Sequence, residues 1–296
     1  QTAIKKAKNT LNGSLSIGGQ EHYYLEGQVA ISIPTEDNEM VVHSSTQNPT
    51  EVQHLVAHVL DVPQNAIEVV TRRMGGGFGG KETDSSQLAC ICAIFSKRTQ
   101  QPVKARLSRK DDILLTGKRH DFVANYEVGY NDEGVIQGIE IDLAARCGYS
   151  LDLSKAIVSR ALFHADNTYF IPNATFKGFL CKTNTASNTA FRGFGGPQGM
   201  LTIENIIEEI ANNMGTDPLN IRQVNYYQKE SNNVTPYDQV IEDNIIEEIT
   251  NELIEESNYL SRRKEVDSFN KENQFVKKGL SFSPVKFGIS FTTQLL

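Results

Sequence analysis

Two glycine-rich segments with the same core sequence constrain this chain more than any other feature. Both contain Gly-Phe-Gly-Gly, at residues 77–80 and 193–196, and each precedes a segment with a helical apolar pattern. Glycine adopts backbone conformations that other residues avoid, and the first turn of a helix presents unpaired N–H groups to an anion. Two such loops therefore predict a site that holds one phosphorylated cofactor from two sides. The alternative is that the glycines only form tight turns.

The first loop also resembles a nucleotide-binding P-loop, but one residue breaks the pattern. In RRMGGGFGGKET, four residues separate Gly75 from Gly80-Lys81, as that motif requires. Glu82 then stands where a serine or threonine would hold magnesium, and its carboxylate would repel phosphate oxygens. A dinucleotide-binding fold is excluded as well, because no clean βαβ unit follows the loop. The role of the glutamate needs another explanation.

The composition excludes several classes of function. The chain is 39% hydrophobic with a net charge of -7, which leaves no basic surface for nucleic acid. No apolar run approaches the roughly 20 residues of a membrane span. The four cysteines form no C-x-x-C pair, so a reduced, cytoplasmic protein is expected. A strand-like pattern that continues into the final FTTQLL indicates a fragment.

Hydrophobic periodicity predicts an α+β fold with mixed sheets and packed helices. Strands are expected on both sides of a turn at 35–38, and at 66–70, 103–109, 121–130, 135–146 and 277–296. Helices are expected at 49–62, 88–95, 201–214, from 217 onward, and at 241–253. Residues 228–238 are polar and show no hydrophobic period, so they are predicted to form a linker. The predicted division is a first domain, residues 1–231, and the start of a second, residues 232–296.

Five segments together carry a resemblance to a known family. They are SSTQNPT, RRMGGGFGGKET, SRALFHADNTYFIPN, CKTNTASNTAFRGFGGPQGM and KFGISFT. Over nearly the whole chain the sequence is similar to the molybdopterin-binding region of the molybdenum hydroxylases, a family that includes xanthine dehydrogenase and aldehyde oxidase. The resemblance implies a molybdopterin-binding domain of that type. It also implies that the pterin holds the molybdenum, with no protein side chain as a direct ligand.

The resemblance assigns residues from three segments to the cofactor. Gln47 matches a glutamine that hydrogen-bonds a molybdenum oxygen, a task that suits an uncharged amide donor. Phe78 and Gly79 match main-chain N–H groups that approach the metal's oxygens and the pterin. The third segment matches the family's other clamp, and its cofactor-binding residues are Ala190, Phe191 and Arg192.

Other residues match the family's substrate site. Phe194 and Phe291 match two rings that enclose a flat heteroaromatic substrate, and Thr292 matches a neighbouring substrate contact. Glu82 and Arg160 match the catalytic residues that bind the polar edge of a purine, where aldehyde oxidases usually carry apolar residues. Arg160 can stabilise the negative charge that builds on the purine oxygen. A site with two such polar groups discriminates against an apolar aldehyde.

The implied activity is hydroxylation of hypoxanthine and xanthine to urate, a step of purine catabolism. Electrons would pass through 2Fe-2S clusters and FAD, in partner domains or subunits, to NAD. The general base, a glutamate in a Gly-Glu motif, lies beyond this chain, and the isolated fragment is predicted to be inactive. A cytoplasmic dimer without nucleic-acid or membrane partners is expected. The alternatives are a hydroxylase for another N-heterocycle or aldehyde, and a non-catalytic cofactor-binding module.

Overall fold

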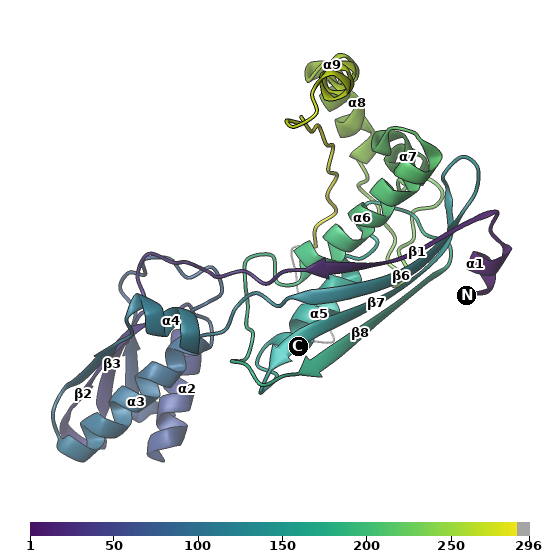
Figure 1. Ribbon diagram of the computed structural model, residues 1–296. Helices are drawn as coiled ribbons and strands as arrows, with labels where there is room; N and C mark the ends of the chain where they lie inside the picture. Colours follow the sequence, from purple (N-terminus) through teal and green to yellow (C-terminus); the bar gives the residue numbers. More distant parts are fainter. Residues whose placement is uncertain (289–296) are drawn as a thin grey trace.

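The computed structural model describes residues 1–288 of the chain. Over this range the chain builds two four-stranded sheets, each packed against helices, and they form two lobes (Figure 1). The smaller lobe takes its strands from residues 29–106, and the larger lobe takes its strands from both sides of that segment. The predicted α+β class with mixed sheets is confirmed.

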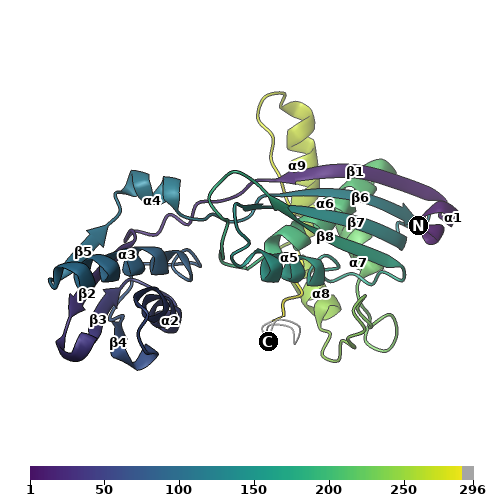
Figure 2. The same ribbon diagram turned by 90° about the horizontal axis from the view of Figure 1, so that it is seen from below.

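The larger sheet has the strand order β1 (Asn9–Ile17), β6 (Phe122–Tyr130), β7 (Ile136–Gly148) and β8 (Ala174–Lys182). The first three strands are antiparallel, and β8 runs parallel to β7. Helices α5 (Ser154–Phe163) and α6 (Gly196–Met214) pack on one face of this sheet (Figure 2). Alternate residues of β6 and one stripe of α6 meet in the main hydrophobic core, which includes Phe122, Ala124, Ile203, Ile206 and Ile210.

The smaller sheet has the strand order β4 (Ile67–Val70), β3 (Met40–Ser44), β2 (Val29–Pro34) and β5 (Val103–Arg106). The parallel pair β3 and β4 is joined through α2 (Pro49–Leu60), which packs beside α3 (Asp84–Thr99). The short helix η1 (Glu36–Asn38) connects β2 to β3, and η2 (Gln64–Ala66) connects α2 to β4. Helix α4 (Arg109–Leu115) lies between β5 and β6 of the larger sheet. A second core joins this sheet to its helices through Val42, Val52, Val56, Ala89 and Ala93.

Within residues 1–288, three further helices follow α6. They are α7 (Pro218–Asn225), α8 (Ile246–Glu256) and α9 (Tyr259–Glu272). As predicted, α7 begins after Asp217, whose side chain accepts a hydrogen bond from Leu219 N–H (2.9 Å). A small third core, formed by Leu219, Tyr259 and Phe282, joins α7 to α9 and to the segment that follows.

Several predicted elements need correction. Residues 277–288, the described part of the predicted C-terminal strand, form no strand, because no neighbouring strand pairs with them. The strand predicted at 103–109 ends at Arg106, since Ser108 accepts a hydrogen bond from Asp111 N–H and starts α4. Periodicity also missed several elements, namely α1 (Thr2–Lys6), β1, α4, α5, β8 and α9.

Candidate functional site

The two Gly-Phe-Gly-Gly loops lie against each other where the two lobes meet. The first follows β4 in the smaller lobe and the second follows β8 in the larger lobe, and Arg192 N–H donates to Phe78 O across them (2.9 Å). A Cβ atom on Gly79 would lie 2.5 Å from Ala190 O, so this close approach requires glycine. The residues predicted in the two loops therefore lie side by side and form one continuous surface.

Gln47 is held by the first loop in a defined orientation. Its side-chain Oε1 accepts hydrogen bonds from Gly79 N–H (2.8 Å) and Lys81 N–H (3.4 Å). A Cβ on Gly77 would lie 2.4 Å from that oxygen, so a larger residue at this position would displace the Gln47 side chain. Within residues 1–288, neither the Nε2 group of this exposed glutamine nor Phe78 N–H has an acceptor. These donors fit a ligand that presents oxygen atoms at the loop.

A histidine and an arginine that the sequence did not predict support the second loop. His22 Nε2 lies 2.6 Å from Ala190 O, and its ring stacks on Phe191 with the centroids 4.7 Å apart. The Arg119 guanidinium lies 3.9 Å from the centroid of the Phe191 ring and donates from Nη2 to Arg192 O (2.9 Å). Burial lowers the pKa of Arg119 to about 10 and also lowers the pKa of His22.

Arg119 gives a second indication of the kind of ligand that the loops suit. Its side chain is buried, and its Nη1 has no hydrogen-bond partner in the described part of the chain. A buried cationic donor without a partner is costly unless an acceptor meets it. An anionic, oxygen-rich cofactor beside the second loop satisfies that requirement. The basic run KRH at residues 118–120 was the sequence signal for this residue.

Glu82 and Arg160, the predicted substrate-binding pair, come from different parts of the fold, since Glu82 follows the first glycine loop and Arg160 belongs to α5. Burial, together with the negative charge of Asp152 just before α5, raises the pKa of Glu82. Arg160 lies on α5 itself, with its guanidinium 4.9 Å from the centroid of the Phe287 ring and a hydrogen bond to Gly288 O. Burial lowers the pKa of Arg160. A raised pKa makes the protonated form of the carboxyl, which can donate a hydrogen bond, easier to reach.

The predicted aromatic residues differ in their surroundings. Phe194 is partly buried and packs against the main core, whereas Phe78 is 50% exposed. Phe291 and Thr292, predicted to complete the substrate site, lie outside the described residues. The structure thus brings together the predicted cofactor-binding residues of both loops and Gln47. It leaves the aromatic sandwich a prediction.

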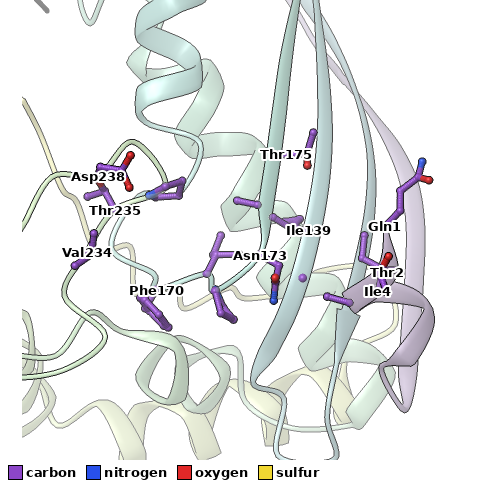
Figure 3. Close-up of a pocket in the computed structure, with 16 residues that line it drawn as sticks. Gln1, Thr2, Ile4, Ile139, Phe170, Asn173, Thr175, Val234, Thr235 and Asp238 are labelled. Atoms are coloured by element: carbon purple, nitrogen blue, oxygen red, sulfur yellow. The ribbon is translucent and has the colours of Figure 1, made fainter.

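Two hollows in the structure differ in how close they lie to the predicted site residues. A cleft of about 370 Å³ includes Thr83, Asp84 and Asp152 in its lining, so it reaches the residue that follows Glu82. Burial raises the pKa of Asp84 to about 7. A larger hollow of about 680 Å³ lies by α1 and the start of β8, with Asn173 and Thr235 among its lining residues (Figure 3). Because the larger hollow contains none of the predicted site residues, its size does not mark the site.

Comparison with known proteins assigns the chain to a class. The family model of the molybdopterin cofactor-binding domain matches residues 1–226. The chain belongs to this family. No helix within residues 1–288 combines the length and the apolar character needed to cross a bilayer.

Individual relatives narrow the comparison. The xanthine dehydrogenase of Dictyostelium discoideum is 45% identical over 98% of this chain and 21% of the relative. The nicotinate hydroxylase of Emericella nidulans is also 45% identical, over 97% of this chain and 21% of the relative. The xanthine dehydrogenase/oxidase of Gallus gallus is 42% identical over 99% of this chain and 22% of the relative. The chain therefore spans about a fifth of the length of these relatives.

Solved structures share the fold. The aldehyde oxidoreductase from Desulfovibrio gigas superposes with a TM-score of 0.82 at 25% identity, over 93% of this chain and 29% of that protein. The quinoline 2-oxidoreductase from Pseudomonas putida 86 superposes with a TM-score of 0.81 at 20% identity, over 92% of this chain and 35% of that protein. The second comparison concerns the fold alone.

Proposed function

We propose that this chain is the molybdopterin-binding portion of a xanthine dehydrogenase, which hydroxylates hypoxanthine and xanthine to urate. The observation that carries the proposal is 45% identity to a xanthine dehydrogenase over 98% of the chain. The paired glycine loops add physical support, because they offer oxygen-directed donors that have no partner within residues 1–288.

The residues that would hold the cofactor come from both lobes. Gln47 and Phe78 N–H would donate to its oxygen atoms, while Ala190, Phe191 and Arg192 would line the other side. The bound molybdenum cofactor would supply oxygen transfer and two-electron redox chemistry. The task of this chain is to orient the cofactor and the substrate and to keep both in fixed positions.

Substrate recognition would depend on Glu82 and Arg160. The guanidinium would donate to the purine oxygen and stabilise the negative charge that develops there, a contribution of about 2.7–4 kcal/mol for one such donor. Glu82, with its raised pKa, would donate a hydrogen bond to a ring nitrogen, or accept one from a ring N–H when ionised. Phe194 would pack on the ring together with Phe291, beside Thr292.

The complete enzyme would need further parts. We propose 2Fe-2S clusters and FAD in partner domains or subunits, NAD as the acceptor, a general base beyond this chain, and a dimeric cytoplasmic protein. We also propose the domain boundary between residues 231 and 232. The family match, which extends to residue 226, supports a boundary in that region.

The test uses the complete enzyme with single substitutions. Arg160→Met is expected to lower kcat/KM on xanthine by about 10²–10³-fold. Glu82→Val is expected to raise KM for both purines and to improve turnover of benzaldehyde, because the pocket becomes apolar. As the contrasting variant, Gln47→Ala should lower the molybdenum content without changing the ratio of xanthine to benzaldehyde activity. Equal losses on both substrates, together with a lower melting temperature, would contradict this proposal.

A second candidate function is hydroxylation of another N-heterocycle. The nicotinate hydroxylase of Emericella nidulans matches this chain with the same 45% identity. A guanidinium such as that of Arg160 binds a carboxylate at least as well as it binds a purine oxygen. Steady-state kinetics of the complete enzyme with xanthine and nicotinate separate the two candidates. A higher kcat/KM for nicotinate would favour the second.

A further inference from the structure

The segment Pro284–Gly288 lies beside the end of α5 and the turn after that helix. Asn167 donates from Nδ2 to Pro284 O (2.9 Å) and accepts at Oδ1 from Lys286 N–H (3.0 Å). Gly288 N–H lies 3.4 Å from His164 Nε2. Polar contacts therefore hold the main chain of the segment at alternate residues, although the segment forms no strand.

One ion pair lies at the centre of these contacts. The Asp166 side chain is fully buried and pairs with Lys286 Nζ. Tyr227 donates from its hydroxyl to the same carboxylate (2.6 Å), and Lys286 Nζ also donates to the hydroxyl of Tyr237 (3.1 Å). A fully buried carboxylate needs a compensating charge, and the segment supplies that charge.

Pro284 is the only buried apolar residue of this segment. The neighbours of Lys286 in the chain, Val285 and Phe287, are 61% and 52% exposed. Hydrophobic stabilisation is proportional to the apolar area removed from water, so these two side chains provide only part of what full burial would provide. Around Lys286 the segment is therefore held mainly by polar contacts, namely the Asp166–Lys286 pair and the hydrogen bonds of Asn167.

The same segment ends on Arg160. Phe287 presents its ring to the guanidinium, and Gly288 O accepts a hydrogen bond from it. Both groups directly follow Lys286 in the chain, so a shift of the lysine would displace two of the contacts that orient Arg160. A guanidinium must be oriented as well as charged to bind a planar ligand through hydrogen bonds.

We propose that the Asp166–Lys286 ion pair is a positioning device that orients Arg160 toward the substrate. Asp166 and Lys286 are positioning residues, since they act through Phe287 and Gly288. The inference rests on the proposed function, in which Arg160 binds the purine. The competing explanation is that the pair only stabilises the fold.

The experiment is a double-mutant cycle in the complete holoenzyme. Asp166→Asn removes the charge and keeps an acceptor for Tyr227. We expect kcat/KM on xanthine to fall by about tenfold to 10²-fold, as for a catalytic group displaced by up to an ångström. In an Arg160→Met background the same substitution should have almost no further effect, because the residue through which it acts is already gone. Molybdenum content should stay at the parental level.

Further variants identify the role of the charge. Lys286→Met should behave like Asp166→Asn, whereas Lys286→Arg, which retains the positive charge, should restore most of the activity. Amide hydrogen exchange in the peptide that contains residues 284–288 should accelerate in Asp166→Asn. Lys229→Met breaks an exposed ion pair with Glu248 and is the matched control, expected to leave kinetics and exchange unchanged.

The possible outcomes are distinct. If Asp166→Asn lowers activity by the same factor in both backgrounds, the pair is purely structural and the proposal is overturned. Normal xanthine kinetics in Asp166→Asn, with Arg160→Met impaired, also overturns it and leaves the proposed function intact. Normal kinetics in Arg160→Met alone overturns the proposed function and, with it, this inference.

Discussion

At the scale of single residues, the two glycine loops have the same local backbone conformation. Phe78 and Phe194 have φ values of 55° and 49°, and the glycines after them have φ values of 101° and 94°. Two successive residues in this region reverse the chain tightly, and an aromatic residue rarely adopts the first conformation. Such strain persists only where the surroundings hold it, and here each loop is supported by the other.

Asp84 makes stability depend on pH. Burial and the charge of Asp152 raise the pKa of Asp84 to about 7, although its hydrogen bond from Gly117 N–H acts in the opposite direction. The unfolded carboxyl has a pKa near 4, so between about pH 4 and 7 the folded state binds more protons than the unfolded state. Stability therefore falls as the pH rises through this range, by up to about 1.4 kcal/mol per pH unit.

The variant Asp84→Asn removes this dependence. Its melting temperature should exceed that of the parent chain at pH 8, and the difference should disappear near pH 4, where the parent's carboxyl is protonated in both states. Thermal unfolding over this pH range measures the effect. Glu133→Gln, at an exposed position in the β6–β7 turn, is the control and should melt like the parent. A difference that stays constant with pH would contradict the assignment.

At the scale of elements, α5 and α6 pack through glycines of α6 and its N-cap. A Cβ on Gly195 would lie 2.0 Å from Ile157 O, and one on Gly199 would lie 2.1 Å from Ala161 O. Both neighbours are main-chain atoms of α5, which cannot rotate away. Because the second loop leads directly into α6, this packing also fixes the position of the loop.

Gly199→Ala tests the packing of the two helices. Alanine in a helix gains about 1 kcal/mol over glycine, but overpacking costs typically about 1–3 kcal/mol and more against a rigid main chain. The clash should prevail, so the free energy of unfolding should fall, as measured by urea denaturation. Gly18→Ala is the matched control, since no atom lies within 4 Å of its added Cβ. An unchanged or higher stability of Gly199→Ala would be inconsistent with this packing.

The elements that the sequence predicted well are those with one buried face. The helix predicted at 49–62 is α2, and the strands predicted at 121–130 and 135–146 are β6 and β7, within two residues at each end. In contrast, β8 is mostly exposed along its length, so it lacks the alternation that marks a strand. Hydrophobic periodicity therefore could not predict β8.

The site was less accessible to prediction from sequence. The glycine pattern predicted two loops around one phosphorylated cofactor, but the contact between the loops joins residues far apart in the chain, and only the family resemblance specified molybdopterin. His22 and Arg119 act on main-chain carbonyl groups of the second loop. Such contacts leave no periodic trace in a sequence.

At the scale of the whole molecule, the chain is much shorter than the enzymes to which it is similar. It spans about a fifth of its relatives, and the proposed general base is not in it. We therefore expect the purified chain, supplied with cofactor and an electron acceptor, to show no purine hydroxylation. Its molybdenum retention after gel filtration should be far below that of the complete enzyme, which serves as the control. Measurable urate formation by the chain alone would refute this expectation.

The smaller lobe leaves the larger sheet and returns to it at one point, since Ile17 and Phe122 are paired at the end of the β1–β6 ladder. The smaller lobe is thus an insertion between β1 and β6. The residues at its two ends are cross-strand neighbours about 5 Å apart. Pairing β1 with β6 closes a very long loop, and non-local pairing of this kind is expected to slow folding. The smaller lobe carries the first glycine loop and the larger lobe carries the second. The two loops can therefore contact each other only after both lobes have formed. We therefore expect the cofactor to bind only when both lobes are folded.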